Sequence, residues 1–130
     1  MIKVLVALFL LAHAGIHASF VSPRPAATAG GPAWPFDLGR SWLLSPLGAG
    51  SELTRPLGLA LLAVTLAGFA VAALSALGIG PTSVWVPSVI VGGVASIALL
   101  GLFFHPWLAL GVAIDIVLIW AVTIADWQPA

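Results

Sequence analysis

Four long apolar segments, separated by stretches that are rich in proline, glycine or polar residues, constrain this chain more than any other feature. They cover approximately residues 2–20, 55–77, 85–104 and 107–125. A helix needs about 20 predominantly apolar residues to cross the hydrocarbon core of a bilayer, so each segment is long enough for one crossing. In lipid, only helices and closed barrels satisfy their own backbone polar groups. The sequence therefore predicts an all-α integral membrane protein with four spans.

The composition excludes several classes of protein. Hydrophobic residues make up 62% of the 130-residue chain and charged residues only 6%, whereas soluble domains contain about 25% charged residues. The formal net charge is zero, so no basic patch offers a site for nucleic acid. The chain contains no cysteine, which excludes disulfides, thiolate chemistry and cysteine-ligated metals. We therefore expect the lipid bilayer, and no nucleic acid, among its partners.

The lengths of the connections predict the topology. The first connection, residues 21–54, is long, and Pro23, Pro25 and Pro35 rule out regular structure across its first half. Its second half, around Trp42, fits either a segment lying in the membrane interface or an ordered loop packed over the helix ends. The later connections are short, which implies antiparallel neighbours. We predict one transmembrane domain over residues 1–130, an up-down-up-down four-helix bundle with a long, partly interfacial first loop.

Local signals refine the ends of the spans. Thr54 suits the N-cap of the second span, which would place Pro56 in its first turn. Gly92 and Gly93 predict a close approach of the third span to a neighbour. Several tryptophans lie at or toward span ends, where they are typical of interface anchors. These are Trp85, Trp107, Trp120 and Trp127.

The first span has an alternative interpretation as a secretory signal peptide. Lys3, a short apolar region and the small-residue sequence Ala12-His-Ala14 resemble the parts of such a signal. We favour a membrane span, because two histidines are unusual in a segment that is removed, and expect a multi-pass protein of the plasma (inner) membrane. The orientation stays open: the arginines of the long loop and its flank place that loop in the cytoplasm, whereas a signal-like first span places the N-terminus there.

Two histidines four residues apart, His13 and His17, lie within the first apolar segment and share one helix face. Titratable groups inside a span are costly and indicate a functional site by default. At a rise of ~1.5 Å per residue, His13 lies roughly 10 Å and Asp115 roughly 12 Å below the membrane face that holds the long loop. Ser96 and Thr65 come out at a similar depth. We predict that these five residues line a polar pocket that opens toward the loop side, where the loop rich in tryptophan and proline can act as its lid.

The edge of this pocket is also predicted from depth. His105, Arg55 and Glu52 fall at the membrane face on the loop side. The opposite half of the predicted bundle contains almost nothing polar, so the polar groups are strongly biased toward one face.

The chemistry of the predicted pocket has several interpretations. His13, His17 and Asp115 provide two imidazoles and a carboxylate, the ligand types of zinc and non-heme iron sites, and heme ligation is a further possibility. The same residues can instead bind a small ligand, or form hydrogen bonds that only hold helices together. The glutamate of the H-E-x-x-H metalloprotease motif is absent. With no evident nucleophile or phosphate-binding loop, the sequence assigns no catalytic residue, and we favour the absence of a cofactor.

Four short motifs are spread over nearly the whole chain: His13-Ala-Gly-Ile-His17 with Phe20, Pro56-Leu-Gly58, Ser96, and Gly111-Val-Ala-Ile-Asp115. Through these motifs the chain resembles a family of small bacterial four-span membrane proteins without a settled activity. In the family, glycine follows the first histidine directly, and asparagine usually stands where this chain has Asp115. The resemblance implies the four-span architecture, and its second departure makes a charge-dependent role of Asp115 more plausible.

Three functions follow as hypotheses. The first is an accessory or structural subunit of a membrane assembly, with membrane-protein partners or further copies of itself. The second is a binding or transport module that takes a small or lipid-like ligand into the His/Asp pocket. The third, a metal- or heme-dependent membrane enzyme, has the least support because so few acid–base groups are present.

Overall fold

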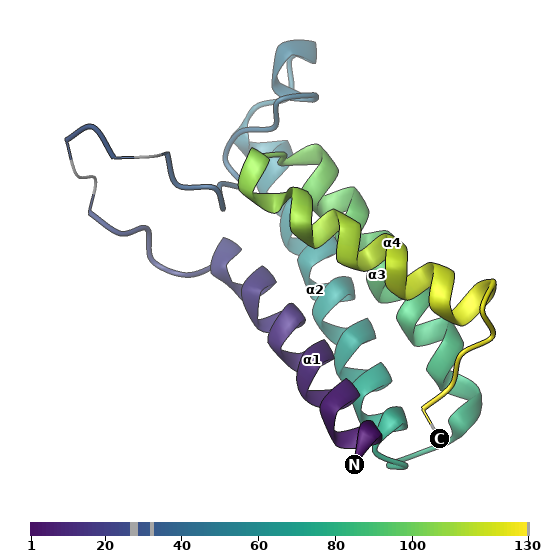
Figure 1. The fold of residues 1–130 in the computed structure, drawn as a ribbon. Helices are drawn as coiled ribbons and strands as arrows, with labels where there is room; N and C mark the ends of the chain where they lie inside the picture. Colours follow the sequence, from purple (N-terminus) through teal and green to yellow (C-terminus); the bar gives the residue numbers. More distant parts are fainter. Residues whose placement is uncertain (27–28, 32, 130) are drawn as a thin grey trace.

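The structure is a computed structural model that describes residues 1–26, 29–31 and 33–129. Its four α-helices are α1 (Ile2–His17), α2 (Ser51–Ala76), α3 (Trp85–Leu102) and α4 (Ala109–Thr123). They run antiparallel in sequence order, with the long loop between α1 and α2 (Figure 1). Together with the short 3-10 turns that adjoin three of them, all four are long and apolar enough to cross a membrane. The predicted all-α, four-span architecture is confirmed.

The start of α2 differs from the prediction. The helix begins at Ser51 with Gly50 as its N-cap, so Pro56 lies inside the helix and not in its first turn. The backbone N–H groups of Leu53 and Thr54 both donate to the carbonyl oxygen of Gly50, at 3.0 Å each. Thr54 is therefore not the N-cap; its buried hydroxyl donates instead to the carbonyl oxygen of Leu38, at 3.0 Å. The prediction was wrong because this tertiary hydrogen bond was not visible in the local sequence.

The helices pack in chain order, α1 on α2, α2 on α3 and α3 on α4. The closest approach in α2–α3 packing is at Gly68 and Gly92, where a Cβ atom added to Gly68 would lie 2.6 Å from the Cα atom of Gly92. A Cβ atom added to Gly93 would meet the side chain of Ile119 on α4 at 3.0 Å. These contacts confirm the predicted close packing at Gly92 and Gly93, as expected where small residues let membrane helices approach.

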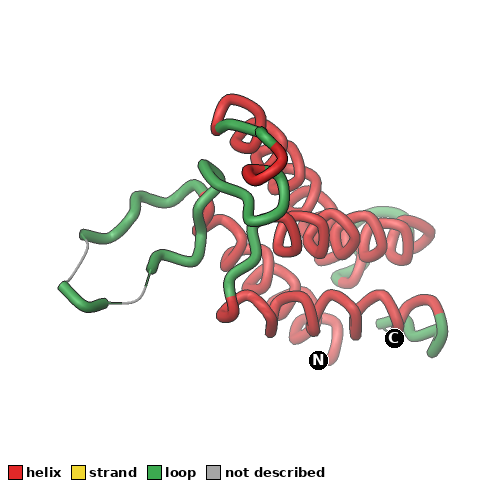
Figure 2. Tube along the Cα trace, turned by 90° about the horizontal axis from the view of Figure 1, so that it is seen from above, coloured by secondary structure: helices red, strands yellow, loops and turns green. Residues whose placement is uncertain are grey.

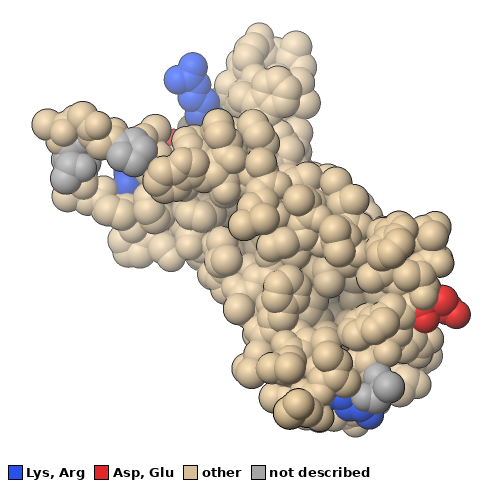
Figure 3. All heavy atoms as spheres, in the orientation of Figure 1, with Lys and Arg blue, Asp and Glu red and all other residues tan. Residues whose placement is uncertain are grey.

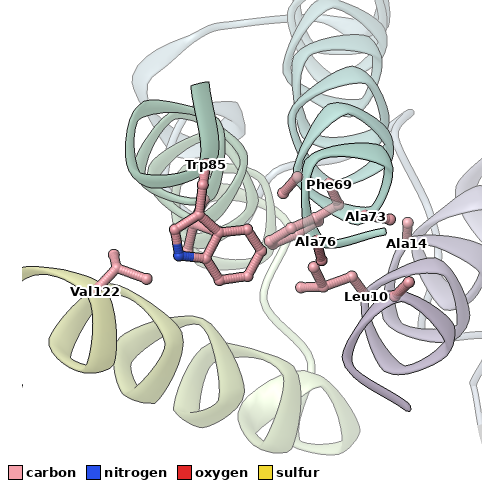
Figure 4. Packing of buried hydrophobic residues seen from close by; sticks show 10 residues of the cluster. Leu10, Ala14, Phe69, Ala73, Ala76, Trp85 and Val122 are labelled. Carbon is pink, nitrogen blue, oxygen red and sulfur yellow. The ribbon is translucent and has the colours of Figure 1, made fainter. Parts of the chain in front are cut away.

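Both termini lie at one end of the bundle (Figure 1), and a cluster of buried apolar residues lies toward that end. The indole of Trp85 is only 2% exposed and lies among residues of all four helices (Figure 4). Its Nε1 donates to the backbone oxygen of Trp127, at 3.3 Å. Trp85 is thus a core residue, and its predicted role as an interface anchor was wrong, whereas Trp107, Trp120 and Trp127 keep exposed surface.

The long loop extends from the opposite end, and its second half returns over the bundle (Figures 1 and 2). Ser41 Oγ donates to the carbonyl oxygen of Leu102, and Trp42 Nε1 donates to that of Gly101, both at 2.6 Å. The last carbonyl groups of a helix have no partner within it. The loop therefore caps the C-terminal end of α3, which matches the alternative of an ordered loop packed over helix ends.

The surface between the two ends is apolar. In the view of Figure 3, charged side chains gather toward the loop end and toward the end with the termini, and the surface between them carries none. Many large apolar side chains on all four helices are exposed there. A soluble protein rarely exposes such a continuous apolar surface, so the bilayer accounts for it, and the chain is a multi-pass membrane protein.

Candidate functional site

A buried polar cluster connects three of the four helices. His13 and His17 are one turn apart on α1, Ser96 comes from α3 and Asp115 from α4. Their exposed fractions are 4%, 2%, 0% and 0%, respectively. Leaving such groups unpaired in an apolar interior costs several kcal/mol each, so their positions require partners within the cluster.

The four side chains satisfy one another in a continuous series of contacts. His13 Nε2 lies 2.8 Å from Asp115 Oδ1, Asp115 Oδ2 lies 2.5 Å from Ser96 Oγ, and Ser96 Oγ lies 2.6 Å from His17 Nε2. His17 Nδ1 donates to the backbone oxygen of His13 at 2.9 Å. The contacts thus return to the residue at which they began, and we call the four residues the polar ring.

The helical repeat explains why α1 supplies two members of the polar ring. An offset of four residues places both imidazoles on one face and brings the second ring within reach of the carbonyl one turn earlier. The helix α2 contributes an apolar wall: the ring of Phe69 meets His13 edge to face, at 5.2 Å between centroids. The helix α2 thus adds no titratable group to the polar ring, whose titratable side chains are those of His13, His17 and Asp115.

Not every residue of the predicted pocket joins the polar ring. Thr65 is buried on α2, but its hydroxyl donates to the carbonyl oxygen of Leu61 in the same helix, at 2.9 Å. Glu52 and Arg55 are exposed at the loop end, and Arg55 lines a separate surface pocket with Arg24 and Asp37. His105 accepts a hydrogen bond from the backbone N–H of Trp107, at 3.3 Å, as the N-cap of the turn that leads into α4.

A pocket of about 180 Å³ lies beside the polar ring, between α1 and α4. His13 and His17 form its polar part, and the remaining lining is mainly apolar. The long loop also lines it, through Pro35 and Phe36, as does Trp107 before α4. The sequence predicted the loop at this pocket but singled out none of these three residues for it. The other lining residues are Ile16, Leu100, Leu108, Leu110, Gly111 and Ile114.

An apolar groove continues from this pocket along the same pair of helices. It is lined by Phe9 on α1 and by a run of α4 residues, and it shares Leu110 and Ile114 with the pocket. The size of the pocket is close to that of a known 150 Å³ apolar cavity that binds benzene. Pocket and groove together have space for one ring, or a short polar head, with an attached chain.

The cluster also has the composition of a metal site. His13, His17 and Asp115 each offer one ligand atom, and these atoms lie within 4.8 Å of one another. The imidazole of His17 has the outer hydrogen bond to a backbone carbonyl that orients many metal-binding histidines. A bound ion would replace the hydrogen bonds His13–Asp115 and His17–Ser96, so the present geometry describes a hydrogen-bonded cluster that a metal would have to rearrange.

The chain has no match among protein-family models, curated proteins or solved structures. The geometry of the polar ring and its pocket is therefore what indicates a function.

Proposed function

We infer that this protein is a membrane-embedded binding module for a small amphipathic ligand, with the ligand's polar group against His13 and its apolar part in the groove between α1 and α4. The pocket beside the polar ring carries this proposal. Ligand sites are concave and mostly apolar, with a few converging polar groups. The pocket combines these features at a depth where hydrocarbon surrounds the bundle.

The position of the pocket favours a ligand that arrives from the bilayer. Helices α1 and α4 are the first and last of the packing order, and they meet through the hydrogen bond of His13 with Asp115. The groove that leads away from the pocket is lined entirely by apolar residues: Phe9, Leu110, Ala113, Ile114, Val117 and Leu118. A chain of a lipid-like molecule finds the same surroundings there as in the bilayer.

A filling substitution in the pocket tests the proposal. We expect native mass spectrometry of the protein, released from lipid nanodiscs, to show a retained small molecule that Ile114→Trp displaces. Ile114 lines both the pocket and the groove, and an indole would occupy that space. The matched control is Ile116→Trp, since Ile116 is 55% exposed on the same helix and does not line the pocket.

Each outcome of this experiment decides between hypotheses. Loss of the added mass in Ile114→Trp but not in Ile116→Trp supports the binding module. Retention of the same mass by both variants places the molecule elsewhere and contradicts it. A second protein that co-purifies with the empty pocket would favour the accessory-subunit hypothesis, and a stoichiometric metal lost in His13→Ala would favour the metal-dependent one.

A further inference from the structure

The hydrogen bonds of the polar ring determine how many protons its four residues must share. Each contact is a hydrogen bond only if one proton lies between its two atoms. The contacts are His13 with Asp115, Asp115 with Ser96, Ser96 with His17, and His17 with the backbone oxygen of His13. A backbone carbonyl accepts and never donates, and a serine hydroxyl has one proton to give. The His17 proton at Nδ1 is therefore fixed, and three further protons are needed.

Neutral imidazoles and an ionised carboxylate do not supply enough protons. Ser96 contributes one, His13 contributes one from Nε2, and His17 has already used its own at Nδ1. One contact would then face lone pair against lone pair in a buried site, which costs more than a missing hydrogen bond. One additional proton completes the polar ring and makes its net charge zero.

The additional proton has two positions that keep all the contacts. Either His17 carries protons on both nitrogens and Asp115 is ionised, or Asp115 carries the proton at Oδ2 and donates to Ser96, whose hydroxyl then donates to His17. In both arrangements His13 donates from Nε2 to Asp115 Oδ1. A proton moved onto Oδ1 would require a doubly protonated His17 and a net positive charge, which is unfavourable in a low-dielectric interior.

Both neutral arrangements leave Nδ1 of His13 without a proton, so this atom is a hydrogen-bond acceptor. It makes no hydrogen bond with any described residue, yet no buried side-chain nitrogen or oxygen among those residues lacks a partner. Nδ1 therefore retains accessible surface on a side chain that is only 4% exposed, and His13 lines the pocket between α1 and α4.

We propose that the pocket selects apolar molecules that donate a hydrogen bond, such as a phenol or a long-chain alcohol, over matched ethers and ketones. The selection comes from the unprotonated Nδ1 of His13, the acceptor that the polar ring presents to the pocket. It rests on the proposed binding function and specifies the ligand's polar group. A donor completes the hydrogen bonding of Nδ1, whereas an ether oxygen places a second lone pair against it.

The test compares two probes of nearly equal shape, 4-octylphenol and its methyl ether 4-octylanisole. Each is titrated into the full chain in phosphatidylcholine nanodiscs, with binding followed by calorimetry. We expect the phenol to bind about tenfold more tightly, the ratio that a net hydrogen bond provides. Ile114→Trp should weaken the binding of both probes, which would show that they occupy the pocket.

Asp115→Asn is a second test of the protonation of the polar ring, and a loss of the preference for the phenol in this variant would contradict the inference. An asparagine accepts from His13 through its oxygen and donates to Ser96 through its nitrogen, and the serine then donates to His17. All contacts form with neutral side chains, and Nδ1 of His13 again has no proton. We therefore expect Asp115→Asn to fold normally and to keep the preference for the phenol.

His13→Phe removes the acceptor, and we expect it to bind the two probes equally. If that variant does not fold, ¹⁵N spectroscopy of histidine-labelled wild type replaces it. One ring nitrogen of His13 should have the ¹⁵N chemical shift of an unprotonated nitrogen. That shift should change when the phenol is added and stay the same when the ether is added.

The possible results separate the inference from the function on which it rests. If neither probe binds in an Ile114→Trp-sensitive way, the proposed binding function fails. If both bind equally, or the ether binds more tightly, the pocket is retained and the donor selectivity is wrong. A protonated Nδ1 in the spectrum would also overturn the selectivity.

Discussion

Between α2 and α3, backbone approaches backbone, because Gly68 and Gly92 leave no room for a side chain. Between α1 and α4, the hydrogen bond of His13 with Asp115 makes the connection, and a pocket stays open beside it. Lipid is as apolar as the core, so helices in a membrane associate by packing or by hydrogen bonding. This chain packs α2 closely against α3 and joins α1 to α4 by a hydrogen bond.

This difference determines where a binding site can exist in so small a bundle. Tight packing of small residues stabilises helices but leaves no space. A directional hydrogen bond holds two helices at a fixed separation and lets an apolar pocket remain between them. The polar ring is therefore compatible with a structural and with a binding role, because His13 and His17 take part in its hydrogen bonds and also form the polar part of the pocket.

The largest expected effect comes from breaking the polar ring. Asp115→Ala leaves His13 Nε2 and Ser96 Oγ without their partner, and each unsatisfied group costs about 1–3 kcal/mol. We expect unfolding in mixed detergent micelles to become easier by about 2–4 kcal/mol. The measurement is a denaturing-detergent titration followed by circular dichroism.

Asp115→Asn serves as the control, since the amide can make both hydrogen bonds, and should change the free energy of unfolding by less than about 1 kcal/mol. An equal loss in the alanine and asparagine variants would show that charge, and not hydrogen bonding, holds α1 and α4 together.

An intermediate effect is expected where α2 packs on α3. Gly68→Ala adds a methyl group against the backbone of Gly92 and forces α2 and α3 apart. We expect a loss of about 1–3 kcal/mol, the usual cost of overpacking. Gly15→Ala is the control, because nothing lies within 4 Å of a Cβ atom added at Gly15 on α1, and the higher helix propensity of alanine should leave stability unchanged or improved. Tolerance of Gly68→Ala would mean that close backbone packing does not hold α2 against α3.

The smallest effect is expected where the loop caps α3. Trp42→Phe keeps an aromatic ring but removes the donor to the carbonyl oxygen of Gly101, so we expect a loss of about 0.5–1.5 kcal/mol. Proteolysis of the loop should become faster in this variant. Trp120→Phe, at an exposed position on α4, should change neither quantity; equal effects of the two substitutions would show that the cap does not hold the loop.

The architecture was predictable because each span has a length and hydropathy that lipid requires. Counting residues from the loop side also placed His13, Ser96 and Asp115 at one depth, and the structure brings them together. Depth carries no information about rotation around a helix axis, however. Thr65 has a suitable depth but bonds its own helix, as threonine commonly does.

The individual contacts of the loop were not predictable from the sequence. Pro35, Phe36 and Trp107 line the pocket through tertiary contacts that leave no periodic signal. The same holds for Ser41 and Trp42, whose partners are more than fifty residues away in the sequence. The interface role predicted for Trp85 was wrong for a related reason. A tryptophan at a span end suits the membrane interface unless a neighbouring segment covers it.

A double-mutant cycle between His13 and Asp115 can show whether side-chain hydrogen bonding joins α1 to α4. The free energy of unfolding is measured for His13→Ala, Asp115→Ala, the double variant and the wild type. We expect a coupling energy of about 1 kcal/mol, within the range that such cycles give for hydrogen bonds between membrane helices. Additive effects, with a coupling energy below about 0.3 kcal/mol, would contradict the account.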